Sequence, residues 1–261
     1  MTDNQLLNSY NSTKIMSKLI QLLDTLEKQI LDIILPKKCL KCKKEGTFLC
    51  FECLNSIKIN SWQVCPICQK SLTKSGEVCR YCKQFKPALD SLTTATSFDD
   101  PLVSKIVHSF KYRFIDELSE PLAKILIKTY QKNKLPLPDI IIPVPLHPLR
   151  LRWRGFNQAE LLAQNIAQNL LPGLPIEANS EILKRIKFTA TQANFKKSTD
   201  REQNVADAFR ADLQTLKKIK NRRILLIDDI CTTGSTLTEC AEQLRKLKPQ
   251  SIHALVIARQ S

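Results

Sequence analysis

The spacing of hydrophobic residues predicts an amphipathic helix near the start of the chain. Hydrophobic residues recur there every three or four positions up to Pro36, at Ile15, Leu19, Leu22, Leu26, Ile30 and Ile33. We expect this helix to pack on the rest of the protein or on a second copy. Membrane attachment is the alternative, but the polar face is partly acidic and lacks the Lys/Arg-rich character that anionic lipid favours.

Beyond Ser91, short hydrophobic runs alternate with segments of helical spacing. The runs predicted as strands are residues 92–96, 139–146, 223–229 and 251–259. The segments predicted as helices are residues 101–110, 117–130, 156–171 and 235–247. This alternation favours an α/β fold with a parallel sheet covered by helices on both faces. Residues 187–202 have no clear periodicity, and such a long segment is either disordered or functional.

Eight of the ten cysteines form four Cys-x-x-Cys pairs. The pairs are Cys39/Cys42, Cys50/Cys53, Cys65/Cys68 and Cys79/Cys82. Each pair places two thiolates on one side of a tight turn, and two such pairs suit a tetrahedral zinc ion. We predict two structural zinc ions, with sequential pairing of the cysteines favoured and crossed pairing as the alternative. A disulfide or redox role is disfavoured in a reducing compartment.

The chain is strongly basic, with a net charge of +15. This charge favours an anionic partner, either a phosphorylated ligand or nucleic acid, although a lysine-rich composition alone explains it equally well. The cysteine module places lysines beside aromatic residues such as Phe51, which suits either single-stranded nucleic acid or a small core kept soluble by lysines. No hydrophobic run is long enough for a membrane span, and no signal peptide is visible. We therefore expect a cytoplasmic protein.

The stretch LLIDDICTTGST, residues 225–236, combines two adjacent carboxylates with a loop of small hydroxyl residues. The predicted strand brings Asp228 and Asp229 to the carboxyl end of the sheet, where ligands bind in such folds. Backbone N–H groups around Gly234, at the start of the next helix, suit a phosphate dianion, and the carboxylates suit vicinal sugar hydroxyls. We predict a sugar-phosphate site, with a capping turn beside a chance acid pair as the alternative. The thiol of Cys231 is expected to be neutral, and redox control is the less favoured interpretation.

This stretch resembles the phosphoribosyl pyrophosphate (PRPP) loop of type I phosphoribosyltransferases. Together with the cysteine pairs and three further stretches, it makes the chain similar to the ComF family of competence-associated proteins, which includes GntX-like relatives. The three stretches are residues 108–113 (HSFKYR), 142–163 (containing PVP and RGFNQ) and 189–209 (containing TATQ and REQN). The resemblance implies a type I phosphoribosyltransferase fold over residues 91–261. It also implies a double zinc ribbon over residues 37–90, preceded by the helix at residues 1–36.

The resemblance also implies roles for individual residues. Asp228 and Asp229 would bind the ribose hydroxyls and help to place Mg²⁺. The 5′-phosphate would be held by Thr232, Thr233, Gly234, Ser235 and Thr236. The segment with Arg150, Arg152, Arg154 and Gly155 would face the pyrophosphate, with a solvated basic turn as the alternative. Residues 187–202 would form a mobile catalytic loop, to which Arg185, Gln192 and Arg201 would contribute.

The function implied by the resemblance is that of a PRPP-binding phosphoribosyltransferase domain acting in natural transformation and DNA uptake. Its partners would be PRPP or a related compound, competence or DNA-uptake proteins, and single-stranded DNA. The sequence does not identify a phosphoribosyl acceptor, and some proteins of this fold bind PRPP as a signal without catalysis. The alternative is a non-catalytic protein that binds single-stranded DNA, or acts as a scaffold, through its zinc module. In that case PRPP is a regulatory ligand or is not bound.

Overall fold

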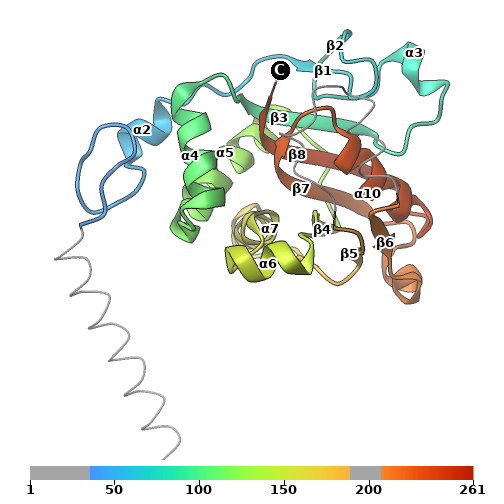
Figure 1. Cartoon of the computed structure of the whole chain (residues 1–261). Helices are drawn as coiled ribbons and strands as arrows, with labels where there is room; N and C mark the ends of the chain where they lie inside the picture. The colour runs from blue at the N-terminus through green and yellow to red at the C-terminus, as the bar shows by residue number, and fades with distance from the viewer. Residues whose placement is uncertain (1–35, 189–206, 261) are drawn as a thin grey trace, which may run out of the picture. The chain divides into compact units, whose positions relative to one another are not determined.

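The computed structural model describes residues 36–188 and 207–260 (Figure 1). The chain divides into two compact units, which we call the N-terminal unit (Met1–Cys53) and the main unit (Leu54–Ser261). The amphipathic helix predicted at residues 15–33 lies outside the described residues. In the N-terminal unit, an antiparallel bridge between Lys38 and Glu45 closes a turn. Helix α2 (Phe51–Asn55) follows and crosses the boundary between the two units.

A four-stranded parallel sheet forms the centre of the main unit. Its strands lie in the order β3 (Ser91–Ser97), β8 (Ser251–Arg259), β7 (Arg223–Cys231) and β4 (Ile140–Pro143). Each neighbouring pair is parallel, as the alternation of strands and helices predicts. Most residues of the four strands are buried, because helices and loops cover both faces of the sheet. The strand predicted to reach Asp229 continues to Cys231.

Helices cover the sheet on both sides (Figure 1). Among the described residues, the helices after β3 are, in chain order, α4 (Pro101–Tyr112), η1 (Asp116–Leu118), α5 (Ser119–Lys132), α6 (Pro148–Arg154), α7 (Gln158–Asn169), η3 (Leu213–Thr215), α9 (Leu216–Ile219) and α10 (Ser235–Arg245). On one side, α5 packs on β3 and β8, while α7 packs on β4 and β7. On the other side, α10 packs on β7. Helix α4 begins sharply because the carboxylate of Asp100 accepts the backbone N–H of Leu102 at 2.8 Å.

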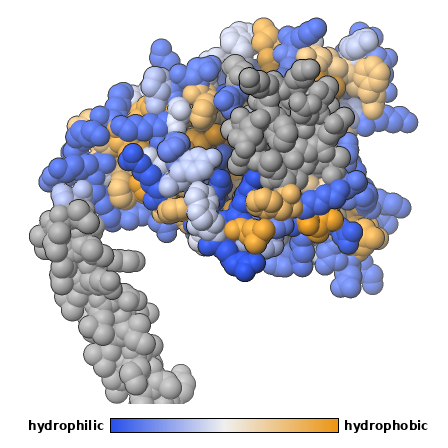
Figure 2. All heavy atoms as spheres, viewed as in Figure 1, coloured by the Kyte–Doolittle hydropathy of each residue, from blue (hydrophilic) through white to orange (hydrophobic). Residues whose placement is uncertain are grey.

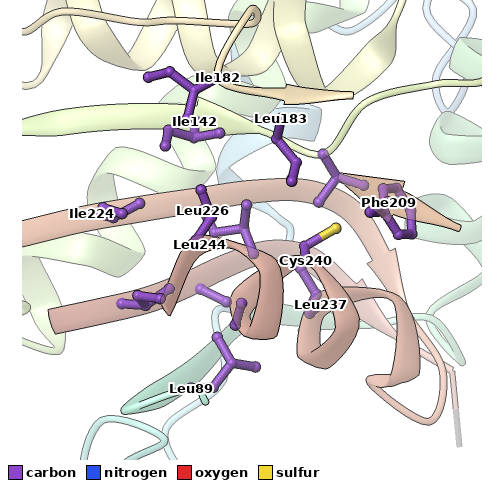
Figure 3. Packing of buried hydrophobic residues seen from close by; sticks show 14 of the residues in the cluster. Leu89, Ile142, Ile182, Leu183, Phe209, Ile224, Leu226, Leu237, Cys240 and Leu244 are labelled. Carbon is purple, nitrogen blue, oxygen red and sulfur yellow. The ribbon is translucent and has the colours of Figure 1, made fainter. Parts of the chain in front are cut away.

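The core between the sheet and α10 follows from the alternation of side chains along the strands (Figure 3). Ile142 of β4 and Leu226 of β7 belong to one buried cluster with Leu237 and Leu244 of α10. Fully burying one such aliphatic side chain stabilises the fold by about 1.5–3 kcal/mol. This packing fixes α10, and therefore the loop that precedes it, against the end of β7.

A short antiparallel pair flanks the segment at residues 189–206. Strands β5 (Leu183–Arg185) and β6 (Phe209–Ala211) pair with Leu183 opposite Ala211. Both strands pack against α10, and Phe209 is buried in the same core. The catalytic loop predicted at residues 187–202 lies almost entirely outside the described residues.

The turns at Cys65/Cys68 and Cys79/Cys82, which we call the knuckles of the second ribbon, belong to a segment attached to the open edge of β3. This part contains the small strands β1 (Gln63–Val64) and β2 (Leu72–Thr73) and helix α3 (Arg80–Lys83). The N–H of Leu92 donates to the carbonyl of Gly76 at 2.9 Å. The side-chain amide of Gln63 donates to the carbonyl of Thr94 at 3.0 Å and accepts the N–H of Thr94 at 2.9 Å. These bonds satisfy backbone groups that would otherwise lie at an open sheet edge.

Figure 2 shows one face of the protein. On the face seen in Figure 2, hydrophilic residues predominate and hydrophobic residues form small patches. Within residues 36–188 and 207–260, no helix has the length and apolar character needed to cross a membrane.

Candidate functional site

The two adjacent carboxylates lie near the carboxyl end of β7 and border one cavity of about 320 Å³. Residues 224–227 of this strand are buried, so the strand is held firmly in the middle of the sheet. Asp229 is only 6% exposed, and its N–H donates to the carboxylate of Asp228 at 2.8 Å. The cavity has the size of a small-ligand site.

A tight loop joins β7 to α10 beside the carboxylates. Gly234 caps the helix with a φ of +87°, in the left-handed region that suits glycine. The hydroxyl groups of Thr233 and Ser235 are 2.9 Å apart, and the side chains of Thr232 and Thr236 border the cavity. The loop therefore presents hydroxyl groups and the positive end of a helix to the space beside the two carboxylates.

Basic side chains from three other elements line the same cavity. Lys111 of α4 forms an ion pair with Asp229, with Nζ 2.9 Å from Oδ1. Arg150 and Arg154 lie four residues apart on α6 and so share one face of that helix, and Arg185 comes from β5. Segments far apart in the sequence thus bring positive charge to the loop and the carboxylates.

The arginines sit in surroundings that oppose their charge. Burial, with Arg185 and Arg154 close by, lowers the pKa of Arg150, and burial lowers the pKa of Arg185. The guanidinium of Arg154 donates to Gln158 at 3.1 Å, while its buried Nε has no hydrogen-bond partner among the residues described. Because clustered, partly buried cations repel one another, an anion bound between them would lower their electrostatic energy.

The surroundings of Asp228 likewise oppose its charge. Burial, together with the charge of Asp229, raises the pKa of Asp228 to about 7, and the positive charge of Lys111 offsets part of this rise. Hydroxyl donors or a divalent cation would stabilise the ionised pair. The site therefore joins a hydrogen-bond-accepting end to an anion-binding end, an arrangement that suits a phosphorylated sugar.

The structure brings together most, but not all, of the residues predicted for this site. Those that line the cavity are Asp228, Asp229, Thr232, Thr236, Arg150, Arg154 and Arg185. Arg152 is exposed and is not part of the lining. Thr233, Gly234 and Ser235 form the turn between the two threonines. Gly155 ends α6 with a φ of +77° and is not part of the cavity lining, and Arg201 lies outside the described residues. The thiol of Cys231 is buried, which raises its pKa to about 11, so it is neutral at physiological pH.

Three contributions to the cavity are not evident from residue chemistry alone. Lys111 lies in the stretch HSFKYR, to which the sequence assigns no chemical role, and its neighbour Tyr112 also lines the cavity. Gln158 joins the wall through its bond to Arg154. The signal available for Lys111 was its place among basic and aromatic residues near the end of a predicted helix.

The eight paired cysteines form two separate groups of four. In the first group, Cys39, Cys42, Cys50 and Cys53, the sulfurs all lie within 4.8 Å of one another; the second group, Cys65, Cys68, Cys79 and Cys82, meets the same limit. The Cys42–Cys50 and Cys68–Cys79 sulfur distances are 3.6 and 3.9 Å. A tetrahedral Zn²⁺ with Zn–S bonds near 2.3 Å requires sulfurs about 3.8 Å apart. The donor sets therefore fit two Cys₄ zinc sites, with sequential pairing of the cysteines.

Comparison with known proteins agrees with this architecture. A family model for the phosphoribosyl transferase domain matches residues 157–261, and one for the double zinc ribbon domain matches residues 30–83. The fold and the cysteine sites thus define a phosphoribosyltransferase-fold protein with a double zinc ribbon.

Relatives of known name narrow this class further. Competence protein F of Haemophilus influenzae is 34% identical to this chain, over 85% of this chain and 96% of the relative. The DNA utilization protein YhgH of Escherichia coli K12 is 29% identical, over 81% and 96% of the two chains, and competence protein ComFC of Bacillus subtilis is 27% identical, over 81% and 84%. The chain belongs to the ComF family of competence-associated proteins.

One solved structure illustrates a more distant similarity. The glutamine PRPP amidotransferase from B. subtilis is 18% identical to this chain, over 53% of this chain and 25% of that one, with a TM-score of 0.34. A likeness of this size carries no argument about the site.

Proposed function

We propose that this protein binds PRPP with Mg²⁺ in the cavity at the end of β7 and that this binding serves DNA uptake in natural transformation. The observation that carries the proposal is the joining of Asp228 and Asp229, the loop before α10 and a cluster of basic side chains in one cavity. The names of the relatives, which refer to competence and to DNA utilization, support the cellular role.

In this proposal, different residues of the cavity bind different parts of PRPP. The loop from Thr232 to Thr236 would receive the 5′-phosphate through its hydroxyl and N–H groups. The carboxylates of Asp228 and Asp229 would accept hydrogen bonds from the ribose hydroxyls. They would also hold Mg²⁺, which would supply positive charge next to the pyrophosphate. Arg150 and Arg154 would face the pyrophosphate and stabilise its negative charge in the bound ligand.

A charge-neutral variant tests this proposal directly. Isothermal calorimetry, in which PRPP with Mg²⁺ is titrated into the zinc-loaded full chain, is expected to show saturable binding. The double substitution Asp228→Asn/Asp229→Asn is expected to weaken binding by about a hundredfold or more, because it weakens two charged hydrogen-bonding groups. Asp116→Asn/Glu117→Gln, which changes an adjacent acid pair outside the cavity lining, serves as the control and is expected to bind normally.

Either of two results would contradict the PRPP proposal. The first is the absence of heat from the folded wild-type chain at millimolar PRPP. The second is an unchanged affinity in the Asp228→Asn/Asp229→Asn variant.

A second candidate function, binding of single-stranded DNA, is favoured by a cluster of exposed aromatic rings beside the cavity. Trp153 is 62% exposed, and Tyr112 and Phe114 are each 42% exposed. The Trp153 ring centroid lies 5.5 Å from that of Phe114 and 6.4 Å from that of Tyr112. The guanidinium of Arg154 lies over the Tyr112 ring at 5.4 Å. We call Tyr112, Phe114 and Trp153 the aromatic cluster.

Basic residues alternate with aromatic residues in both stretches that form this cluster. Trp153 stands between Arg152 and Arg154, and Arg113 lies between Tyr112 and Phe114. Stacking of bases on such rings, combined with phosphate contacts by neighbouring cations, is how proteins bind single strands without sequence preference. Phe114 also adopts a left-handed backbone conformation, with a φ of +56°, which is costly for a bulky residue and is often found at functional positions.

Fluorescence anisotropy with a labelled oligothymidylate tests the second candidate. Trp153→Ala/Phe114→Ala is expected to weaken binding about tenfold or more, because each stacked base contributes substantially to affinity. The control is Tyr81→Ala/Phe85→Ala, which removes another pair of exposed aromatic rings. Tyr81 lies between Cys79 and Cys82 and Phe85 lies just after Cys82, and their ring centroids are 5.7 Å apart. Loss of binding in the control variant but not in the first would assign DNA binding to the zinc module instead.

A further inference from the structure

We propose that Gln69, in the second zinc ribbon, is a positioning residue for the phosphate-binding loop. Its side-chain Nε2 donates a hydrogen bond to the backbone carbonyl of Thr233 at 3.0 Å, across 164 positions of sequence. The proposal concerns the geometry of the loop, and its consequence for PRPP binding rests on the function proposed above. In this proposal the second ribbon orients the phosphate-binding loop and also covers the edge of β3.

The bond acts on the peptide unit that joins Thr233 to Gly234. In a trans peptide the C=O and N–H groups point in opposite directions. A carbonyl held by Gln69 therefore directs the N–H of Gly234 away from the ribbon. Glycine permits more than one orientation of such a peptide, and Gly234 has a φ of +87°, so a hydrogen bond from outside the loop restricts the orientation of this peptide.

The second ribbon can fix the loop because it is hydrogen-bonded to β3 and to the end of α5 within the main unit. The hydroxyl of Thr93 donates to the carbonyl of Ser75 at 2.6 Å, and the hydroxyl of Ser75 donates to the carbonyl of Asn133 at 2.9 Å. These bonds are buried and lie beside the double hydrogen bond between Gln63 and Thr94. These bonds therefore fix the position of the Cys65/Cys68 knuckle relative to the sheet.

The knuckle turn in turn places Gln69. The N–H of Gln69 donates to the carbonyl of Cys65 at 3.0 Å, and Gln69 has a left-handed φ of +54°. It directly follows Cys68, one of the four sulfurs of the second group. Zinc binding at this group would hold the turn closed and keep the side chain of Gln69 in reach of Thr233.

The first ribbon contains the same turn and so offers a matched control. Lys43 directly follows Cys42, has a φ of +69°, and donates its N–H to the carbonyl of Cys39 at 3.0 Å. Both knuckles thus share one backbone geometry, but the residue at this position is lysine in the first and glutamine in the second.

The test uses Gln69→Met, which keeps the length of the side chain and removes the donor. In the ligand-free, zinc-loaded full chain, ¹⁵N relaxation is expected to show the order parameters of Gly234 and Ser235 falling from about 0.85 towards 0.6. The Kd for PRPP with Mg²⁺ is expected to rise about three- to tenfold, the effect of losing one hydrogen bond. Gln69→Lys, which retains a donor, is expected to restore both values, and Lys43→Met is expected to leave both unchanged.

The outcomes separate this inference from the proposed function. A wild-type chain that binds no PRPP would contradict the proposed function, and the relaxation data would still decide whether Gln69 orders the loop. Unchanged order parameters in Gln69→Met would overturn the positioning role. An equal effect of Lys43→Met would also overturn it. If the wild-type chain binds PRPP, a looser loop with unchanged affinity in Gln69→Met would contradict the expected consequence for PRPP binding.

Discussion

Replacing Cys65 and Cys68 with serine is expected to lower the thermal midpoint of the main unit by about 10 °C, whereas the same change at Cys39 and Cys42 leaves that midpoint unchanged. A ribbon without its metal is unfolded, so the first variant loses the structure that covers the edge of β3. The exposed edge and the broken bonds to Leu92 and Thr94 then destabilise the sheet itself. Differential scanning calorimetry measures the midpoint.

The second variant is the control because its cysteines belong to the N-terminal unit, which is compact by itself. Zinc content should fall by one ion per chain in either variant, which shows that each substitution has emptied one site. Equal shifts of the midpoint in the two variants would contradict the unequal roles of the two zinc sites.

Replacing Gly76 with alanine is expected to destabilise the main unit by about 3 kcal/mol or more. A Cβ atom at this position would lie 2.0 Å from the backbone carbonyl oxygen of Leu92, so the backbone of the ribbon or of β3 must move. Gly76 also has a φ of +80°, which adds a conformational cost for alanine. Urea unfolding monitored by circular dichroism measures the loss.

Gly173→Ala provides the comparison for this effect. Gly173 has a φ of +79°, but a Cβ atom there meets nothing within 4 Å among the described residues. The variant is expected to lose only about 1–2 kcal/mol, the cost of the left-handed conformation. The difference between the two variants measures the close approach of the ribbon to β3, and similar losses in both would argue against that close approach.

The order of strands and helices was predictable because hydrophobic spacing reports it directly. The runs at residues 139–146 and 223–229 became strands β4 and β7 of the parallel sheet, and the helix predicted at 235–247 became α10. The attachment of the second ribbon to β3 was not predictable. It depends on Gln63 and Gly76, whose side-chain amide and missing Cβ matter only once the partner backbone is in place.

The candidate site was partly predictable for a similar reason. The carboxylates of Asp228 and Asp229 and the loop after them are contiguous in sequence, so their chemistry can be read from one stretch. The basic wall is assembled from three separate segments. Three arginines at alternate positions would share one face in an extended chain, but residues 148–154 form a helix in which alternate positions are about 200° apart. As a result Arg150 and Arg154 line the cavity, while Arg152 is exposed.

Because the second ribbon is hydrogen-bonded to β3, chimaeras of two ComF-family proteins should keep this ribbon and the sheet from the same parent. The boundary between the two compact units lies between Cys53 and Leu54, inside α2. A chimaera of two ComF-family proteins that share the sequence of α2, joined at that point, keeps the contacts within the main unit in one parent. A crossover at residue 90 would instead separate Gly76 and Gln63 from the strand whose backbone they fit. The two ribbons, although similar in their cysteine spacing, therefore differ in how they can be exchanged between proteins. We expect the first ribbon to be replaceable by itself and the second only together with the sheet.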